Sequence, residues 1–146
     1  MTTKVKPVPQ GHHTVTPYLV VSGVGKLIEF AKQAFGAKEV FLFKGPDGTV
    51  QHAEVKIGDS IVMMGEGGPG GKQFPGMLHL YMEDVDAVYR RAIEAGAKSI
   101  REPADQPQGD RMGGVEDQFG NQWWIATHIE DVTPEEMERR AKAAKS

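Results

Sequence analysis

An internal repeat limits the folds open to this chain more than any other feature of the sequence. The segments "AFGAKEV" (34–40) and "EAGAKSI" (94–100) align at an offset of 60 residues. Upstream of each lie a strand pattern, a turn and a helix pattern that ends at glycine. Downstream of each lie a strand, a turn and a further strand. Each half of the chain therefore predicts the order β-α-β-β-β.

Local signals support a helix in each half. Apolar residues recur at helical spacing over about residues 24–35, and Gly36 is predicted to end that helix because glycine adopts a left-handed conformation at little cost. The second helix is predicted over about residues 85–95, with Asp84 as its N-cap and Gly96 as its stop.

The same patterns divide the chain into parts. The N-terminal segment is rich in Pro, Gly and Lys, so we expect a flexible arm and no signal peptide. The C-terminal segment predicts a charged helix with Thr133 as N-cap and Glu136 completing a capping box. That helix is either solvated or clasps a partner subunit. The predicted parts are an arm (1–13), a domain (14–130) made of two modules (14–66 and 76–130) and a Gly-rich linker (65–75), and a C-terminal helix (131–146).

Composition excludes several functions. The chain of 146 residues has the size of one domain and contains no cysteine, which excludes thiolate metal sites and a Cys nucleophile and agrees with a cytoplasmic location. With 17 basic and 20 acidic residues the net charge is −3, so we expect no nucleic-acid partner. No apolar run approaches the ~18 residues of a membrane span, so we expect no membrane partner.

Alternation along the predicted strands separates two faces. One face is apolar and is predicted to pack under the helices; it comprises Leu19, Val21, Ala53, Val55, Ile57, Val62, Met64, Leu78, Leu80, Met82, Trp123 and Ile125. The other collects Tyr18, His52, Glu54, Met63, Met77, His79, Tyr81 and Trp124. That second set is too polar for a core and too apolar for an open face, which favours a curved sheet whose hollow binds a ligand. A solvated sheet face with scattered aromatic residues is the alternative.

In this layout the chain resembles the vicinal-oxygen-chelate superfamily, the glyoxalase, bleomycin-resistance and extradiol-dioxygenase group, and is most similar to its PhnB-like branch. The resemblance covers about residues 14–140 and rests on "TPYLVVSGVGKLIEFAKQAFGAKEV", "HAEVKIGDSIVMM", "LHLYMEDVDAVYRRAIEAGA" and "GDRMGGVEDQFGNQWWIATHIEDVTPEEMERR". It implies an α+β fold in which paired βαβββ modules form a curved, cup-like mixed sheet with the helices outside. It also implies a homodimer that binds a small organic molecule, as drug-sequestering relatives do.

In metal-dependent members of that family, the first, fourth, fifth and eighth strands each supply one His or Glu ligand. By this resemblance the matching positions are Thr16, Met63, Met77 and Trp124. A hydroxyl, two thioethers and an indole do not suit a hard or borderline divalent ion. We therefore expect no metal and no other cofactor.

The alternative function is a divalent-metal-dependent lyase or dioxygenase with displaced ligands. His52 and His79 could supply two imidazoles, and Glu54 or Glu116 a carboxylate, which together suit Fe(II), Zn(II) or Mn(II). Without a metal, Glu54 and Glu116 remain the candidate catalytic residues, because they occupy similar places in the two halves. A carboxylate in a partly apolar hollow can act as an acid or a base.

Two further residues are candidates for ligand binding. Arg111 lies in a Gly-flanked segment and is predicted either to bind a ligand carboxylate or phosphate, or to form a structural salt bridge with Asp110 or Asp117. Trp124 is predicted to form a pocket wall on which a conjugated ligand stacks. A third hypothesis is that the protein is a purely structural dimer whose pocket has lost its ability to bind a ligand.

Overall fold

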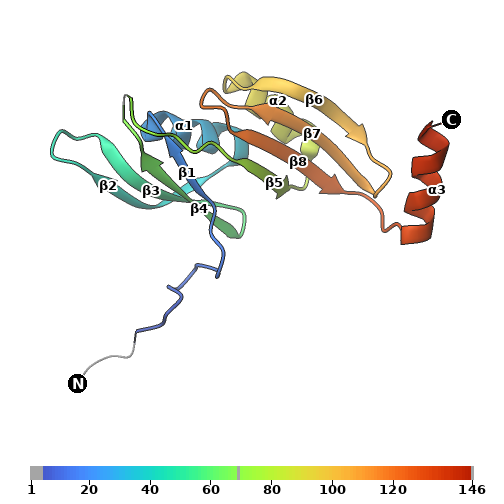
Figure 1. The fold of residues 1–146 in the computed structure, drawn as a ribbon, viewed down its shortest axis with the longest axis horizontal. Helices are drawn as coiled ribbons and strands as arrows, with labels where there is room; N and C mark the ends of the chain where they lie inside the picture. Colours follow the sequence, from blue (N-terminus) through green and yellow to red (C-terminus); the bar gives the residue numbers. More distant parts are fainter. Residues whose placement is uncertain (1–4, 69, 146) are drawn as a thin grey trace. The chain divides into compact units, whose positions relative to one another are not determined.

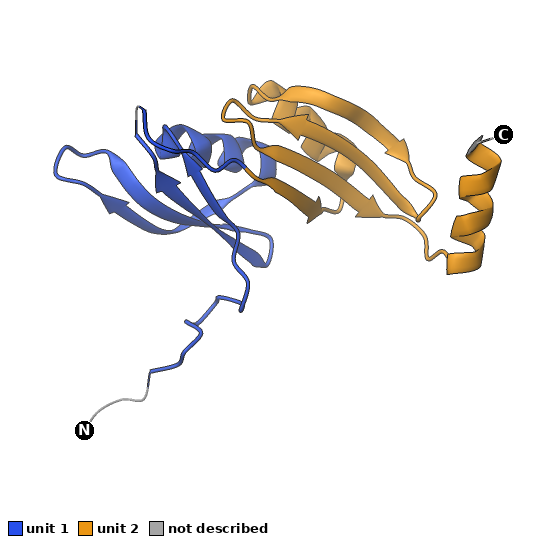
Figure 2. Ribbon diagram, viewed as in Figure 1, with its two compact units in different colours: residues 1–75 blue, residues 76–146 orange. Residues whose placement is uncertain are grey.

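The computed structural model describes residues 5–68 and 70–145, and its elements follow the predicted order (Figure 1). The chain divides into two compact units, unit 1 (residues 1–75) and unit 2 (residues 76–146) (Figure 2). The elements of unit 1 are β1 (Tyr18–Val21), α1 (Val24–Phe35), β2 (Lys38–Lys44), β3 (Val50–Ile57) and β4 (Ser60–Glu66). Those of unit 2 are β5 (Met77–Tyr81), α2 (Val85–Glu94), β6 (Lys98–Asp105), β7 (Asp110–Glu116), β8 (Gln122–His128) and α3 (Pro134–Lys145).

Each unit contains one four-stranded mixed sheet. The strand order is β1-β4-β3-β2 in unit 1 and β5-β8-β7-β6 in unit 2. The first strand of each module pairs in parallel with the fourth, and the other pairs are antiparallel. The prediction of an α+β fold with two βαβββ modules is therefore confirmed, and its strands form two sheets of four.

The two helices cover one face of their own sheets. Helix α1 has the predicted bounds, ends at Gly36 with φ 67°, and contacts β3 and β4 through a buried apolar face. Helix α2 contacts β6, β7 and β8. The Asp84 carboxylate accepts from the Ala87 N–H at 3.2 Å, which confirms the predicted N-cap. This helix ends at Glu94, one residue before the prediction, and Ala95 and Gly96 form its stop.

The predicted packing faces form the cores of the units. Trp123 and Ile125 of β8 and Ala53 and Val55 of β3 are fully buried. Residues Leu78, Leu80 and Met82 in and after β5 are only half-buried, whereas Leu19 and Val21 of the equivalent strand β1 are buried. We call the face of each sheet opposite its helix the far face.

A side chain from the fourth strand holds the start of each helix. In unit 1, the Glu66 carboxylate at the end of β4 accepts from the backbone N–H groups of Gly23, Val24 and Gly68 at 3.0–3.1 Å. In unit 2, the Thr127 hydroxyl of β8 accepts from the Val85 N–H at 2.9 Å and donates to the Met82 carbonyl at 2.8 Å. The first N–H groups of a helix have no partner within the helix, so these side chains stabilise both helix starts.

The strand β2 is an edge of its sheet with apolar side chains on both of its faces. Val40, Phe41 and Phe43 are each about half exposed, and Lys38 and Lys44 stand at the two ends of the strand.

The predicted linker and arm are partly built into unit 1. Gly65 and Glu66 belong to β4, and Phe74 bridges to Val20 of β1, so both ends of the segment 65–75 join the sheet of unit 1. In the arm, a tight turn places the His12 N–H against the Pro9 carbonyl at 3.0 Å. In the described part of the arm, residues 5–13, His12 also contacts Glu54 on the far face of the unit 1 sheet.

The C-terminal helix α3 is held to its own unit through Arg140. The Thr133 hydroxyl accepts from the Glu136 N–H at 3.1 Å, which confirms the predicted N-cap. The Glu136 carboxylate pairs with Arg139 and Arg140 instead of completing the predicted capping box. Arg140 also donates to Glu130 and to the Pro107 carbonyl between β6 and β7. Within residues 5–68 and 70–145, no helix is long and apolar enough to cross a membrane.

Removing the Glu66 carboxylate should loosen the start of α1. We expect Glu66→Ala to lower the free energy of unfolding by about 0.5–2 kcal/mol, the range found for loss of a helix N-terminal acceptor. Glu66→Gln keeps one oxygen acceptor and should cost less. Urea denaturation measures both, with Glu29→Ala, an exposed glutamate of the same helix, as the matched control. Equal stability of Glu66→Ala and Glu29→Ala would contradict this role.

Candidate functional site

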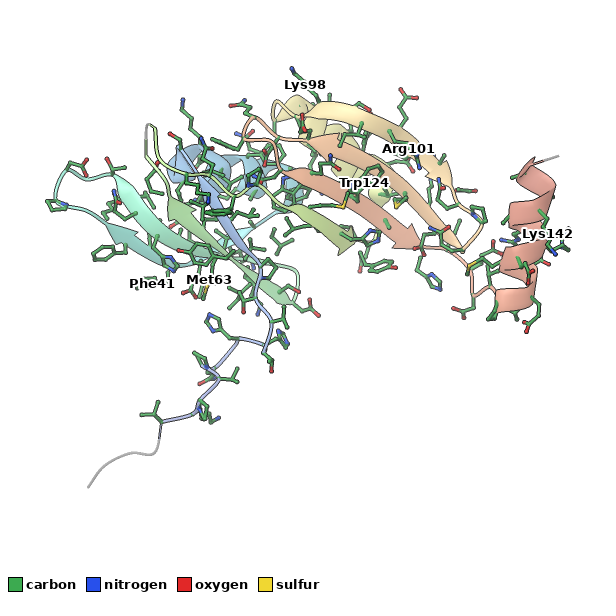
Figure 3. All side chains as sticks on the ribbon, viewed as in Figure 1. Phe41, Met63, Lys98, Arg101, Trp124 and Lys142 are labelled. Atoms are coloured by element: carbon green, nitrogen blue, oxygen red, sulfur yellow. The ribbon has the colours of Figure 1, made fainter. Side chains whose placement is uncertain are left out.

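The predicted ligand-binding residues lie on the far faces of the two sheets, except Arg111, which lies on the side of α2 and pairs with Asp86. Strand register aligns Tyr18, Met63, Glu54 and Phe41 in one row across sheet 1. The next row consists of Val20, Gly65, His52 and Phe43. In sheet 2 the corresponding rows are Met77, Gln122, Glu116 and Lys98, then His79, Trp124, Gly114 and Arg101. Figure 3 labels Phe41 and Met63 of the first sheet and Lys98, Trp124 and Arg101 of the second.

Four polar side chains form a hydrogen-bonded chain on the far face of sheet 1. The Tyr18 hydroxyl lies 3.1 Å from Nδ1 of His52, and Nε2 of His52 lies 3.4 Å from Oε2 of Glu54. The other carboxylate oxygen, Oε1, lies 2.8 Å from Nε2 of His12. The order is therefore phenol, imidazole, carboxylate, imidazole, and we call it the Tyr18–His12 chain. Tyr18 is half exposed, whereas Glu54 and His12 are each 14% exposed.

A glycine makes room for this chain. A Cβ atom added to Gly65 would lie 2.6 Å from the Tyr18 hydroxyl, closer than real Cβ contacts. The tyrosine side chain from β1 therefore crosses β4 over Gly65 to reach His52 on β3. The His52 ring lies 5.7 Å from the Tyr18 ring and 6.1 Å from the Phe41 ring, so aromatic residues flank it on two sides.

Sequence reasoning missed His12, which it placed in the flexible arm. The structure puts its ring against Glu54, and Nδ1 of His12 is the buried side-chain nitrogen or oxygen without a hydrogen-bond partner in the part of the chain that is described. No periodicity marks an isolated His in a Pro- and Gly-rich segment. The adjacent pair His12-His13 upstream of a strand was the one available signal.

On the far face of sheet 2, Trp124 rests on a second glycine. A Cβ added to Gly114 would lie 2.7 Å from the indole ring, so the ring lies directly over the Gly114 backbone. The guanidinium of Arg101 lies 5.7 Å from the ring centroid, within the range of a cation–π contact. The indole Nε1 donates to Gln122 Oε1 at 3.1 Å, which restrains the ring. Trp123, one residue earlier, is fully buried and donates to Asp117 at 2.9 Å.

The other predicted ligand-binding residues of unit 2 are exposed. Met77, His79 and Tyr81 of β5 all lie on the far face, and Met77 and Tyr81 are each about two-thirds exposed. The His79 and Tyr81 rings contact edge to face at 4.9 Å. Binding of a ligand by these residues stays a prediction.

The two candidate catalytic carboxylates occupy equivalent register positions. Glu54 pairs with Met63, which pairs with Tyr18 of the first strand. Glu116 pairs with Gln122, which pairs with Met77. The structure therefore confirms that the two glutamates hold similar places in the two modules, while a catalytic role for either stays a prediction.

Arg111 forms a structural ion pair with partners other than the two that the sequence suggested. Its guanidinium donates to both carboxylate oxygens of Asp86 at 2.8 and 3.0 Å and to Asp105 at 3.1 Å. The hydrogen bonds to the Arg111 guanidinium lower the pKa of Asp86. Asp110 and Asp117, the partners expected, bind other groups. Because its donors are committed to two carboxylates, Arg111 is a poor candidate for the ligand-binding role.

Asp110 instead joins a polar cluster at the end of β8. The Tyr81 hydroxyl donates to Asp110 Oδ2 at 3.2 Å, and Nδ1 of His128 lies 2.8 Å from Oδ1. Nε2 of His128 lies 2.8 Å from Asp131. The hydrogen bonds to Asp131 and Asp110 raise the pKa of His128, and the charge and hydrogen bond of Asp110 raise the pKa of Tyr81.

The four positions that the resemblance matches to the family's metal ligands are not paired with one another across the strands. Met63 pairs with Tyr18, whereas Thr16 lies before β1 begins; Met77 pairs with Gln122, whereas Trp124 pairs with His79. Over residues 5–68 and 70–145, no three His, Asp or Glu side chains form a group able to hold a metal ion. Both ring nitrogens of His52 already face protein partners, so a metal ion would have to displace Tyr18 or Glu54. The expected absence of a metal stays a prediction.

Comparison of the sequence identifies the family. Residues 10–125 match the Glyoxalase/Bleomycin resistance protein/Dioxygenase superfamily. The protein belongs to this superfamily, because the match spans most of the chain. An uncharacterized protein of Mycobacterium bovis is 36% identical over 135 residues, which cover 85% of this chain and 89% of that protein. An uncharacterized protein of Mycobacterium tuberculosis strain H37Rv is also 36% identical over 135 residues, covering 85% of this chain and 79% of that protein.

Solved structures share the fold. TioX from Micromonospora sp. ML1 has a TM-score of 0.69 and 24% identity, covering 80% of this chain and 99% of that chain. A glyoxalase/bleomycin resistance protein/dioxygenase family enzyme from Burkholderia phytofirmans PsJN has a TM-score of 0.62 and 18% identity, covering 77% of this chain and 95% of that chain. At these identities the likeness shows the fold alone.

The His128 cluster makes the stability of unit 2 depend on pH. Because the folded-state pKa of His128 is raised, its contribution to stability is fully present at acid pH and is lost as the pH rises through that raised pKa. The hydrogen bond to Asp131 is the largest cause of the raised pKa of His128, so Asp131→Asn should lower that pKa. An NMR titration of the imidazole measures both proteins, with Asp59→Asn in unit 1 as the control. Identical His128 titrations in the wild type and Asp131→Asn would contradict the assignment.

Proposed function

We propose that this protein binds a small organic molecule with a flat conjugated ring, and that Trp124 is the surface on which the ring stacks. The observation that carries this proposal is that the Trp124 indole contacts the backbone at Gly114 and is restrained by its hydrogen bond to Gln122. A ring already held in place loses little conformational freedom when a ligand stacks on it. Membership of a superfamily that includes bleomycin-resistance proteins supports the binding of an organic ligand.

Arg101 and Lys98 indicate the charge of the ligand. Both cationic side chains come from β6 and lie in the rows that contain Trp124 and Glu116. The Arg101 guanidinium is within reach of any group stacked on the indole, since it already lies 5.7 Å from the ring centroid. A guanidinium binds a carboxylate through two parallel hydrogen bonds, which favours an aromatic ligand with an acidic substituent.

Fluorescence titration tests this proposal with 2-naphthoate as an aromatic carboxylate and bleomycin as a larger conjugated ligand. Trp123 is fully buried, so quenching by a bound ligand reports mainly on Trp124. We expect Trp124→Leu to weaken binding at least about tenfold, or about 1.4 kcal/mol, and Arg101→Gln to weaken the carboxylate alone.

Lys142→Gln removes a cation from the exposed face of α3 and serves as the charge control. Binding of both compounds with equal affinity to the wild type and Trp124→Leu would contradict the stacking role. Thermal unfolding of each variant shows whether lost affinity reflects lost structure.

We further propose that binding needs no metal or other cofactor. The support is the donor chemistry at Thr16, Met63, Met77 and Trp124, where a hydroxyl, two thioethers and an indole do not suit divalent ions. Mass spectrometry of the purified protein should find less than one divalent ion per chain, and EDTA should leave 2-naphthoate binding unchanged. A stoichiometric ion that is lost together with affinity in His52→Gln would instead support the metal-dependent alternative.

We also propose that the protein is a homodimer, that it is cytoplasmic and that it belongs to the PhnB-like branch of the superfamily. The family resemblance supports the dimer and the branch, and the absence of cysteine agrees with a reducing compartment.

A further inference from the structure

The Tyr18–His12 chain contains the groups of an acyl-transfer site. A neutral imidazole has one donor and one acceptor nitrogen. Glu54 as a carboxylate only accepts, so Nε2 of His52 carries the hydrogen and Nδ1 accepts from the Tyr18 hydroxyl. This assignment follows from the hydrogen-bond network. A hydroxyl thus points its proton at a base that a carboxylate orients, in the order that activates nucleophilic hydroxyls.

The carboxylate of this chain is anchored at both oxygens. Glu54 is 14% exposed and faces His52 on one side and His12 on the other. Nδ1 of His12 is buried without a hydrogen-bond partner within the described residues. The two imidazoles together fix the position of the Glu54 carboxylate, which in turn orients the ring of His52.

The phenol oxygen is reachable from solvent. Tyr18 is 49% exposed, and its ring is held over Gly65 with no side chain beneath it. Met63 lies beside Tyr18 in the same row, and Phe41 lies at the other end of that row on β2. An apolar acyl group could pack on these side chains while its carbonyl carbon meets the Tyr18 oxygen.

We propose that Tyr18 is a nucleophile toward activated esters, with His52 as its general base and Glu54 and His12 as positioning residues. In the first step the bond between Tyr18 Oη and the acyl carbon forms, the bond to the leaving oxygen breaks, and the phenolic proton passes to His52 Nδ1. His52 passes that proton to the leaving oxygen. In the second step water attacks the acyl carbon and gives one proton to His52 Nδ1, the bond between that carbon and Tyr18 Oη breaks, and the carboxylic acid is released. His52 then returns its proton to the Tyr18 oxygen.

The protein has three tyrosines, and two of them, Tyr81 and Tyr89, serve as internal controls for Tyr18. The Tyr81 hydroxyl donates to the Asp110 carboxylate, which raises its pKa and holds its proton. The Tyr89 hydroxyl donates to the Ser99 hydroxyl. Tyr81 also contacts an imidazole, that of His79, but only ring to ring at 4.9 Å. The Tyr18 hydroxyl is the one of the three that hydrogen-bonds to an imidazole nitrogen, so only Tyr18 should react quickly, although Tyr81 is the more exposed at 65%.

The experiment uses 4-nitrophenyl acetate with the intact wild-type chain. Release of 4-nitrophenolate gives the rate, and peptide mapping by mass spectrometry locates the acetyl group and separates tyrosine from lysine products. We expect acetylation of Tyr18 to be at least about 100-fold faster than that of Tyr81 or Tyr89, the lower end of general-base catalysis. Acetylation of Tyr18 at the rate of Tyr81 overturns the proposal without any variant.

Variants separate catalysis from structure. Tyr18→Phe should abolish the fast phase of 4-nitrophenolate release, which we assign to acetylation of Tyr18. His52→Gln should lower the rate of Tyr18 acetylation to that of Tyr81 and remove the dependence of this rate on pH. The matched controls Tyr89→Phe and His13→Gln should leave the fast phase unchanged. Glu54→Gln should change the ratio of His52 tautomers seen by nitrogen NMR, a signal that a merely structural role would not alter. A fast phase that survives His52→Gln in a folded protein, or that EDTA removes, overturns the proposal.

Discussion

The parallel pairing of the first and fourth strands in each module determines which side chains can meet on the far faces. In unit 1 it sets Tyr18 beside Met63, and in unit 2 it sets Met77 beside Gln122. The helix between the strands must then begin at the end of the sheet where Glu66 or Thr127 can accept its first N–H groups. The start of the helix, the strand register and the rows of the far face are therefore fixed together. If one strand shifted its pairing by a single residue, each of its side chains would move to the opposite face of the sheet.

Two glycines give the two faces different chemistry. In the second row of each sheet, glycine stands on β4 in unit 1 and on β7 in unit 2. In unit 1 the space over Gly65 admits a tyrosine from the edge strand, which then meets an imidazole. In unit 2 the space over Gly114 admits the indole of Trp124, which then meets a guanidinium. The same fold thus presents one face suited to proton transfer and another suited to stacking.

Periodicity in the sequence was enough to predict the modules, the helix bounds and the two faces. Alternation along a strand is local, so Glu54 and His52 were placed on the correct face, and the repeat matched Glu54 with Glu116 correctly. Contacts between distant segments leave no such pattern. The docking of His12 on Glu54 and the pairing of Arg111 with Asp86 depend on how the arm and α2 pack, and no local spacing reveals them.

The edge strand β2 has a consequence for the folding chain. Its free edge carries unpaired backbone groups, and its half-exposed Val40, Phe41 and Phe43 would let a second β2 add beside it. Stacking identical strands in register would, however, bring Lys38 against Lys38 and Lys44 against Lys44 in adjacent copies. Repulsion between these like charges opposes such in-register stacking of the exposed edge.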